Sequence, residues 1–276
     1  MNDWILELTY DCNYTCFHCN AGFGAPKNTG RFVTLEEVKA RNFSEGITVT
    51  GGEPLYNPYF IEISEYLAKN GHKLLLQTNA SLFTPKLIEA VKKFYKRIIV
   101  SFNACDESIY NKLSGTTGNL FKVVKNIQEL TNSSLGVLTT SIIQKDNLAH
   151  LPVLIDFLNS EFSQAGSMLA MVHGVGQAGI NDCFISYTSF LETLSKEVSK
   201  FRKYYIIYDI PRCVTAKYPQ LITDKSKYQF CDYRREYKQI KNCEGCKFIS
   251  VCPGVSRAYL NKYGDSEIVA QKIFTK

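Results

Sequence analysis

Three cysteines near the start of the chain have a spacing that could hold an iron–sulfur cluster. Cys12, Cys16 and Cys19 form a C-x3-C-x2-C pattern within one short segment. Cysteine thiolates are the ligands that hold the irons of such clusters. Three thiolates can hold three irons of a 4Fe–4S cubane, which leaves the fourth iron without a protein ligand. An open iron can bind a small molecule, so the pattern predicts a reactive site rather than simple electron transfer.

A second motif follows about one strand and one helix later. Residues 47–50 form a β-branched run that predicts a strand, and Gly51, Gly52, Glu53 and Pro54 follow it. Glycines let a backbone approach a ligand closely, and a glutamate can pair with a cationic group. An ordinary Gly-Gly turn would also explain these residues. Their place shortly after the cysteine segment favours a ligand-binding turn.

Together the two motifs resemble those of the radical S-adenosylmethionine (SAM) enzymes. The resemblance implies that SAM binds the open iron and that its amino group lies on the Gly-Gly-Glu-Pro turn. It also implies that the reduced cluster cleaves SAM to methionine and a 5′-deoxyadenosyl radical. That radical would remove a hydrogen atom from the substrate. An electron donor such as flavodoxin or ferredoxin is then expected as a partner.

Strand-like and helix-like segments alternate along the first two thirds of the chain. The predicted strands are residues 4–10, 47–50, 73–78, 97–103, 135–143 and 168–172. The predicted helices are residues 34–41, 59–70, 84–94, 119–131, 148–160 and 187–201. Such alternation predicts a parallel sheet with right-handed crossovers. The expected fold class is α/β, a partial (β/α)6 TIM barrel, which the resemblance also implies.

The chemistry-bearing residues follow the strands, where ligands bind in barrels of this kind. The resemblance implies further SAM contacts from polar or aromatic residues near these strand ends. These residues are His18, Thr78, Asn79, Ser101, Asn103 and Ser141. In the segment Gly174-Val175-Gly176-Gln177-Ala178, which resembles a Gly-Arg-Ala segment of related enzymes, Gln177 replaces the arginine. A charge-based contact is therefore not expected there.

Composition excludes several other classes of protein. The chain has 276 residues, of which 45% are hydrophobic, with ten cysteines and a net charge of +6. The first residues do not resemble a signal peptide, and no apolar run is long enough to span a membrane. No basic-aromatic stripe indicates nucleic acid. Many cysteines without a signal peptide indicate metal sites in the reducing cytoplasm rather than disulfides.

Helical periodicity fades after about residue 204, and cysteines return. Cys243, Cys246 and Cys252 form a C-x2-C-x5-C pattern. The pattern is compatible with a zinc knuckle. Together with the tail after Cys252, it resembles the SPASM and twitch extensions of radical SAM enzymes. We therefore expect residues 1–204 to form the barrel and residues 205–276 a small twitch-like extension with one auxiliary 4Fe–4S cluster.

The fourth ligand of the second cluster has two candidates. Cys213 is the preferred one with Cys243, Cys246 and Cys252, whereas a competing set uses Cys231 in place of Cys213 or Cys252. If Cys231 is not a ligand, it could donate a hydrogen atom to a substrate radical, or it could simply be a buried cysteine. Two further cysteines have no cluster partner by spacing, Cys105 and Cys183.

The sequence gives less information about the substrate than about the reaction. One hypothesis is the maturation of a ribosomally made peptide by cross-linking or epimerisation, because SPASM-like tails are common in such enzymes. The alternative is a dehydrogenase or epimerase of a carbohydrate or aminoglycoside. A third hypothesis is an iron–sulfur or zinc protein without catalysis. The short segment ahead of Cys12 disfavours a built-in leader-binding domain and allows a separate leader-binding protein.

Overall fold

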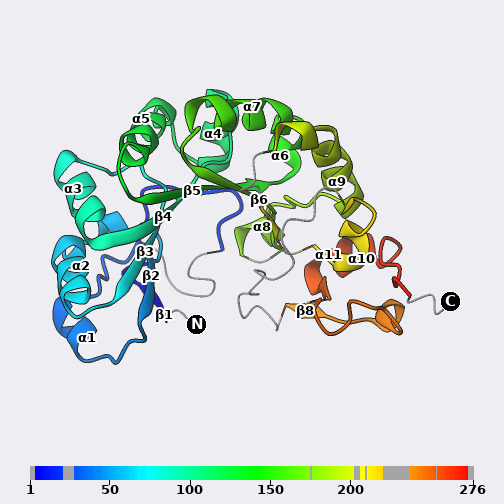
Figure 1. The fold of residues 1–276 in the computed structure, drawn as a ribbon, viewed down its shortest axis with the longest axis horizontal. Coiled ribbons are helices and arrows are strands. Elements are labelled where there is room, and N and C mark those ends of the chain that lie inside the picture. The colour runs from blue at the N-terminus through cyan, green and yellow to red at the C-terminus, as the bar shows by residue number, and fades with distance from the viewer. Residues whose placement is uncertain are drawn as a thin grey trace.

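A single parallel sheet in sequence order dominates the computed structural model (Figure 1). The structure describes residues 4–20, 28–174, 176–201, 206–208, 210–219, 236–252 and 254–272. The strands of this sheet are β1 (Trp4–Glu7), β2 (Gly46–Thr50), β3 (Lys73–Thr78), β4 (Tyr95–Ser101), β5 (Gly136–Ile143), β6 (Gly166–Met171) and β7 (Ile206–Tyr208). All neighbouring strands pair in parallel.

Most of the helices lie along the convex side of the curved sheet, and the concave side of the sheet is called the hollow below (Figure 1). They are α1 (Leu35–Lys39), α2 (Phe60–Lys69), α3 (Pro85–Phe94), α4 (Glu107–Ser114), α5 (Leu120–Thr131), α6 (Lys145–Leu148), α7 (Leu151–Glu161), α8 (Gln177–Ile180) and α9 (Tyr187–Lys196). The short 3-10 helices η1 (Pro54–Tyr56) and η2 (Val198–Lys200) lie between them. The predicted fold class, an α/β partial barrel, is confirmed.

The seventh strand is an addition to the six that the sequence predicts. β7 pairs with β6 at the edge of the sheet and lies just beyond residue 204. It therefore continues the barrel sheet past the expected domain boundary. The division into residues 1–204 and 205–276 stays a prediction.

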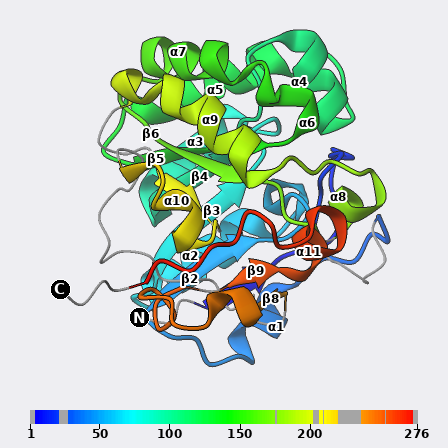
Figure 2. The ribbon, with the colours of Figure 1, turned by 90° about the vertical axis from the view of Figure 1, so that its right-hand side faces the viewer.

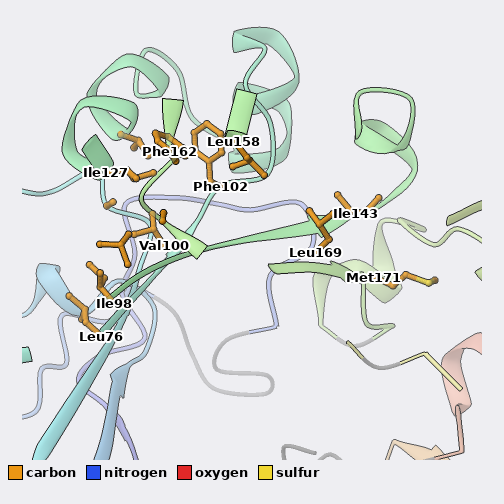
Figure 3. Packing of buried hydrophobic residues seen from close by; sticks show 14 of the residues in the cluster. Leu76, Ile98, Val100, Phe102, Ile127, Ile143, Leu158, Phe162, Leu169 and Met171 are labelled. Atoms are coloured by element: carbon orange, nitrogen blue, oxygen red, sulfur yellow. The ribbon is translucent and has the colours of Figure 1, made fainter. Parts of the chain in front are cut away.

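Alternation along the strands creates one buried and one open face. Leu6, Val49, Leu76 and Val100 are fully buried against the helices, as period-2 strands with one packed face require. Figure 3 shows Val100 and its neighbours on the helix side, where Phe102 and Phe162 meet edge to face with centroids 5.1 Å apart. The core therefore lies between the strands and helices, and the other strand face lines the hollow.

The elements after β7 form a small unit beside the last part of the barrel. They are α10 (Arg212–Thr215), β8 (Tyr237–Lys238), η4 (Lys241–Cys243), β9 (Val255–Ser256) and α11 (Arg257–Tyr263), and β8 pairs with β9 in antiparallel orientation. Figure 2 shows α11 and β9 in front of the open side of the barrel. Among the described residues, no helix has the length and apolar character needed to cross a membrane.

Glu267 connects this C-terminal unit to the barrel by hydrogen bonds. Its carboxylate accepts hydrogen bonds from the N–H groups of Tyr187 (3.2 Å) and Thr188 (3.0 Å) at the start of α9. The Tyr259 hydroxyl also donates to Glu267, and the Tyr259 ring stacks on Tyr187 with centroids 3.8 Å apart. An anionic side chain at a helix N-terminus is favourable, so this contact fixes the unit at one place.

Candidate functional site

The cysteine segment follows β1 and is held by backbone contacts to distant elements. Thr15 N–H donates to the Ser114 carbonyl (3.1 Å) and Phe17 N–H donates to the Leu113 carbonyl (2.9 Å), both at the end of α4. From the other side, Gln177 N–H donates to the Cys19 carbonyl (2.9 Å). These contacts fix the path of the loop that carries Cys12, Cys16 and Cys19, all of which are partly exposed.

Asp11 closes the base of this loop. Its buried carboxylate accepts hydrogen bonds from the N–H groups of Thr29 and Gly30, each at 2.7 Å. Cys12 N–H in turn donates to the Asn28 side-chain oxygen (3.3 Å). A carboxylate that accepts two backbone N–H groups forms strong, charge-assisted hydrogen bonds. The sequence analysis did not single out Asp11, although it lies next to the first cysteine.

The Gly-Gly turn after β2 packs directly on the start of the cysteine loop. Gly52 N–H donates to the Thr9 carbonyl (2.7 Å) and Glu53 N–H donates to the Asp11 carbonyl (2.9 Å). A Cβ at Gly51 would lie 2.2 Å from the Thr9 carbonyl oxygen, and φ of Gly51 is +137°. The glycines are therefore needed for a close approach of backbone to backbone, and this approach brings the two motifs together.

Glu53 is fully buried at the point where the turn meets β3. Its carboxylate accepts hydrogen bonds from the Thr78 hydroxyl (2.6 Å) and from the N–H groups of Asn79 (2.8 Å) and Leu55 (3.2 Å). Burial raises its pKa to about 7, and these hydrogen bonds oppose the shift only in part. No cation among the described residues contributes to this pKa. A buried carboxylate of this kind fits the cationic amino group that the sequence predicts as its ligand, and Pro54 follows it in η1.

Amide side chains link the end of β3 to the cysteine loop. The Asn79 side-chain N–H donates to the Asn13 side-chain oxygen (3.1 Å) and lies 3.9 Å from the Cys12 Sγ. Asn13 donates in turn to the Ser81 hydroxyl (2.8 Å). The structure thus brings Thr78 and Asn79 to Glu53, and Asn79 also to Cys12. Their contact with SAM stays a prediction.

His18 contacts Gln144, which directly follows β5 and which the sequence analysis did not name. Its Nδ1 lies 3.3 Å from the Nε2 of Gln144, whose side chain is buried. Among the described residues, the buried Oε1 of Gln144 has no hydrogen-bond partner. Burial lowers the pKa of His18 to about 4, so the ring is neutral at neutral pH. Gln144 directly follows a predicted strand, and this position could have identified it as a candidate site residue.

The three predicted contacts from β4 and β5 lie in different surroundings. Ser101 is exposed at the end of β4. Asn103 is buried and its side-chain oxygen accepts from the Ile142 N–H (2.8 Å). Ser141 is fully buried and its hydroxyl donates to the Phe102 carbonyl (2.5 Å). Ser101 therefore faces the hollow, whereas Ser141 faces the packed side of the sheet.

A row of polar side chains lines the hollow near the carboxyl ends of the strands. Glu7 lies opposite Thr50 in the β1–β2 register, and the Thr50 hydroxyl donates to the Gln77 side-chain oxygen (3.2 Å). Ser101 lies opposite Thr140 in the β4–β5 register. Apart from Ser101, the sequence analysis did not name these residues, although their period-2 alternation with buried neighbours was visible. They form the surface that a substrate in the hollow would meet.

The C-terminal cysteines lie near one another in the small unit. Burial, together with the nearby Cys252, Cys246 and Cys243, raises the pKa of Cys213 to about 11. Cys252 Sγ accepts from the Arg212 N–H (3.4 Å), and Cys246 N–H donates to the Cys243 carbonyl (3.1 Å). The preferred ligand set is thus gathered in space. Cys231, the alternative ligand and candidate hydrogen donor, lies outside the described residues.

Neither group of cysteines resembles a site for a single metal ion. In the part of the chain that the structure describes, no three or more His, Cys, Asp or Glu side chains are arranged to hold one ion. Zinc needs its ligands within about 2.3 Å of one centre.

The two remaining described cysteines lie outside both groups. The Cys105 thiol lies 3.2 Å from His150 Nε2. Cys183 is buried and its thiol lies 3.6 Å from the Phe17 carbonyl. Burial raises the pKa of each thiol to about 11, which disfavours a thiolate at either position.

Comparison with known proteins places this geometry in a family. The Radical SAM superfamily matches residues 6–158. The chain is 26% identical over 154 residues to the AdoMet-dependent heme synthase of Methanosarcina barkeri, covering 52% of this chain and 43% of the relative. It is 28% identical over 150 residues to the antilisterial bacteriocin subtilosin biosynthesis protein AlbA of Bacillus subtilis, covering 51% and 33%. The chain therefore spans less than half the length of these curated relatives.

Among solved structures, the fold is similar to that of Streptococcus suis SuiB bound to the precursor peptide SuiA. The TM-score is 0.65 at 15% identity, covering 99% of this chain and 62% of SuiB. This likeness supports the partial-barrel fold. Because the match to the superfamily extends over more than half of the sequence and includes the cysteine loop and the Gly-Gly-Glu-Pro turn, the chain belongs to the Radical SAM superfamily.

Proposed function

We propose that this protein uses radical SAM chemistry to modify a ribosomally made peptide, by cross-linking or epimerisation. The observation that carries the proposal is the position of Glu53. This buried carboxylate lies on a turn that is hydrogen-bonded to the base of the loop carrying Cys12, Cys16 and Cys19. A cluster on these thiols and the amino group of SAM on Glu53 would then share one mouth of the barrel.

The residues around this mouth have separate tasks in the proposed reaction. When bound, the reduced cluster and SAM supply a 5′-deoxyadenosyl radical that removes a hydrogen atom from the substrate. Glu53 binds the amino group of SAM and is held in position by Thr78 and Asn79. The neutral His18, packed beside Gln144, covers the side of the site towards β5. The helices keep water away from the packed face of the sheet, while the polar row orients the substrate in the hollow.

The second cysteine group is proposed to hold one auxiliary 4Fe–4S cluster on Cys213, Cys243, Cys246 and Cys252. Cys252, Cys246 and Cys243 all lie close enough to raise the pKa of Cys213, and Cys243 and Cys246 raise that of Cys252, which supports this set. In a Cys213→Ser variant, reconstituted iron should fall from about eight atoms per chain towards about four. Cys105→Ser is the matched control and should keep the full iron content. An unchanged iron content in Cys213→Ser would favour the set that contains Cys231.

The peptide substrate is supported by two relatives. AlbA is a bacteriocin biosynthesis protein, and SuiB has been solved with its precursor peptide. The C-terminal unit, with its gathered cysteines, is the feature that the sequence analysis links with peptide-modifying enzymes. A leader-binding protein and a flavodoxin or ferredoxin are the partners that such a reaction needs, and we propose both.

A direct test begins with anaerobic reconstitution of the clusters and reduction by dithionite. Release of 5′-deoxyadenosine from SAM is expected from the wild type and should be lost in Cys16→Ser. Incubation with a precursor peptide encoded beside the gene should then give a mass change of that peptide. Absence of 5′-deoxyadenosine with both clusters intact would instead favour a non-catalytic iron–sulfur protein.

Epimerisation and cross-linking can be separated in deuterated water. An epimerase that uses Cys231 as hydrogen donor should incorporate solvent deuterium at the modified carbon, and Cys231→Ala should abolish this incorporation. A cross-linking enzyme should give a product that is lighter than its substrate by the mass of the hydrogens lost. A second candidate is a dehydrogenase or epimerase of a carbohydrate or aminoglycoside, and the similarity to a heme synthase supports only that the substrate is a small molecule. Modification of a carbohydrate, with no change to any precursor peptide, would favour that candidate.

A further inference from the structure

Asn13, Asn79 and Ser81 form a closed ring of side-chain hydrogen bonds beside Cys12. Asn79 donates to the Asn13 side-chain oxygen (3.1 Å), and Asn13 donates to the Ser81 hydroxyl (2.8 Å). This hydroxyl donates to the Asn79 side-chain oxygen (2.7 Å), which closes the ring. Asn79 and Ser81 are buried. Because the donors follow one another around the ring, each amide and hydroxyl group in it has one settled role.

The backbone of Ser81 determines which end of the Asn79 amide faces the cysteine. Ser81 N–H donates to the Asn79 side-chain oxygen (2.9 Å). A backbone N–H can only donate, so the amide oxygen has to lie on the Ser81 side and the NH2 group on the side of Cys12. One N–H of this group is used by Asn13. The other is left for the Cys12 Sγ, which lies 3.9 Å from the nitrogen.

The backbone after Asn79 adopts a conformation that residues other than glycine rarely take. Ala80 is fully buried and has φ of +59°. Its N–H donates to the Thr78 hydroxyl (3.0 Å), and its carbonyl accepts from the Asn126 side chain (2.8 Å). Strain of this kind persists only where the surroundings hold it, and it is common at functional sites. Here the turn returns Ser81 to the Asn79 side chain and so keeps the amide in place.

The Cys12 sulfur also accepts a hydrogen bond from its own loop, since Tyr14 N–H lies 3.4 Å from the Sγ. An N–H donor stabilises negative charge on a cysteine sulfur. Reduction of a cluster adds an electron whose charge is shared with the sulfur ligands. Hydrogen bonds to the sulfurs therefore help to set the reduction potential of a cluster. Asn79 offers the side-chain donor, which a substitution can remove without changing the backbone.

We infer that Asn79 donates to the Cys12 sulfur and thereby raises the reduction potential of the cluster held by Cys12, Cys16 and Cys19. The inference rests on the proposed cluster at these cysteines. Asn79 acts here through Cys12 and is a positioning residue for electron transfer. It makes it easier for one electron to pass from a flavodoxin or ferredoxin, which is oxidised, to the cluster, which is reduced.

A redox titration of the reconstituted protein, followed by electron paramagnetic resonance without SAM, measures this effect. The signal that Cys16→Ser loses identifies the cluster of the N-terminal cysteines. Asn79→Leu has nearly the same size and no N–H in its side chain. At the wild-type midpoint, the ratio of reduced to oxidised cluster should be about tenfold lower in this variant, a shift of about 59 mV for one electron. Asn79→Asp keeps the acceptor for Ser81 and adds a negative charge, so it should lower the potential further.

Asn13→Leu is the matched control. It places the same side chain in the same ring and removes two of the hydrogen bonds of the ring. Asn79 keeps both donors from Ser81, so its NH2 group still faces Cys12. The potential of Asn13→Leu should therefore equal that of the wild type. An equal lowering in both leucine variants would overturn the inference, because the polarity of the ring and not the Asn79 N–H would then set the potential. A wild-type potential in Asn79→Leu would overturn it as well.

A measurement on the unchanged side chain keeps the test decisive if the Asn79 variants assemble no cluster. The protein is made with asparagine that carries nitrogen-15 in its side chain. The reduced cluster should show a weak magnetic coupling to this nitrogen. The coupling should persist in Asn13→Leu and in Asn28→Ser, which remove other asparagine side chains near Cys12. Absence of the coupling, or its loss in these variants, would overturn the inference.

Both measurements are made without SAM and peptide, so they separate the inference from the proposed function. A lowered potential in Asn79→Leu, with no release of 5′-deoxyadenosine by the wild type, would support the role of Asn79 and contradict the proposed function. Peptide modification by the wild type, with an unchanged potential in Asn79→Leu, would contradict the inference alone. If Cys16→Ser keeps every iron–sulfur signal, both are wrong.

Discussion

The Glu53 carboxyl group is buried, and its pKa of about 7 links the stability of the protein to pH. Its ordinary pKa is 4.5, so the folded state binds the proton more tightly than the unfolded state does. The stability contribution is therefore fully present below about pH 4.5 and is lost as pH rises through 7. At about 1.4 kcal/mol per pKa unit, the loss is about 3 kcal/mol.

Glu53→Gln should remove this dependence. We expect the unfolding free energy, measured by urea denaturation without SAM, to fall between pH 5 and pH 8 in the wild type. In the variant this fall should be smaller by about 3 kcal/mol. SAM should also reduce the fall in the wild type, because its ammonium group stabilises the ionised carboxylate. Equal pH dependence in the two proteins would contradict the assignment of the raised pKa to Glu53.

Asp11 should matter for cluster retention although it binds no iron. Asp11→Asn replaces one acceptor oxygen by an NH2 group that faces the N–H donors of Thr29 or Gly30. An unsatisfied buried donor costs about 1–3 kcal/mol. We expect the reconstituted variant to lose iron faster than the wild type during gel filtration. Asp106→Asn makes the same chemical change at the N-cap of α4 and should retain iron normally.

Sequence reasoning found the residues that carry chemistry and missed some that position them. The cysteines and Glu53 stand out because their types and spacing are rare together. Asp11 and Gln144 act through partners that are distant in sequence: Thr29 and Gly30 for Asp11, and His18 for Gln144. No local pattern reveals such partners, because the pairing depends on how the loops meet in space.

At the level of elements, the Gly-Gly turn joins the two motifs and should tolerate no side chain. In Gly51→Ala, the added methyl would collide with the Thr9 carbonyl. We expect a loss of stability of about 3 kcal/mol or more, because the collision adds to the strain of a positive φ. Gly71→Ala is the control: its φ is +83° but nothing lies within 4 Å of the new Cβ. It should cost only about 1 kcal/mol. Thermal unfolding of both variants measures the difference.

The predicted strands and helices are correct where burial of one face gives the sequence a regular hydrophobic period. All six predicted strands are present, but β1 ends at Glu7 rather than at Tyr10, because Leu8 and Thr9 turn to contact residues 32 and 33. Helix α4 was not predicted. Its signals were local and readable, since Asp106 accepts from the Ile109 N–H as N-cap and Gly115 ends the helix with φ of +64°. Its role in holding the cysteine loop was not readable from sequence.

At the level of the whole molecule, we expect the barrel and the C-terminal unit to come apart more easily when Glu267 is replaced by alanine. Glu267→Ala removes the acceptor of the Thr188 N–H group and of the Tyr259 hydroxyl, and one of the two acceptors of the Tyr187 N–H group. We expect faster cleavage between α9 and α11 in limited proteolysis, with the barrel fragment left intact, and faster hydrogen exchange at Thr188. The exposed Glu244→Ala serves as control and should be cleaved as the wild type is. Equal cleavage of both variants would show that other contacts hold the unit.

The alternation of strands and helices in the sequence was enough to predict the overall architecture. The contact between the barrel and the C-terminal unit could not be predicted from it. Repeated strand–helix units have few ways to pack, so the sheet order was predictable. The contact between Tyr259 and Tyr187 joins positions far apart in sequence, and neither residue has a pattern that indicates its partner. The same reason explains why β7 was not predicted: its three residues are too short to show a period.

The contacts that hold the cysteine loop also set an order of events during synthesis of the chain. Phe17 accepts a hydrogen bond from the Asn181 side chain, 164 residues later, and Cys19 accepts one from Gln177. The loop leaves the ribosome early, but its final shape depends on segments that follow only after most of the barrel has been made. At typical elongation rates the delay is about 10–30 s. Iron delivery should therefore succeed only late, and a truncated chain that ends before α8 should not hold the cluster.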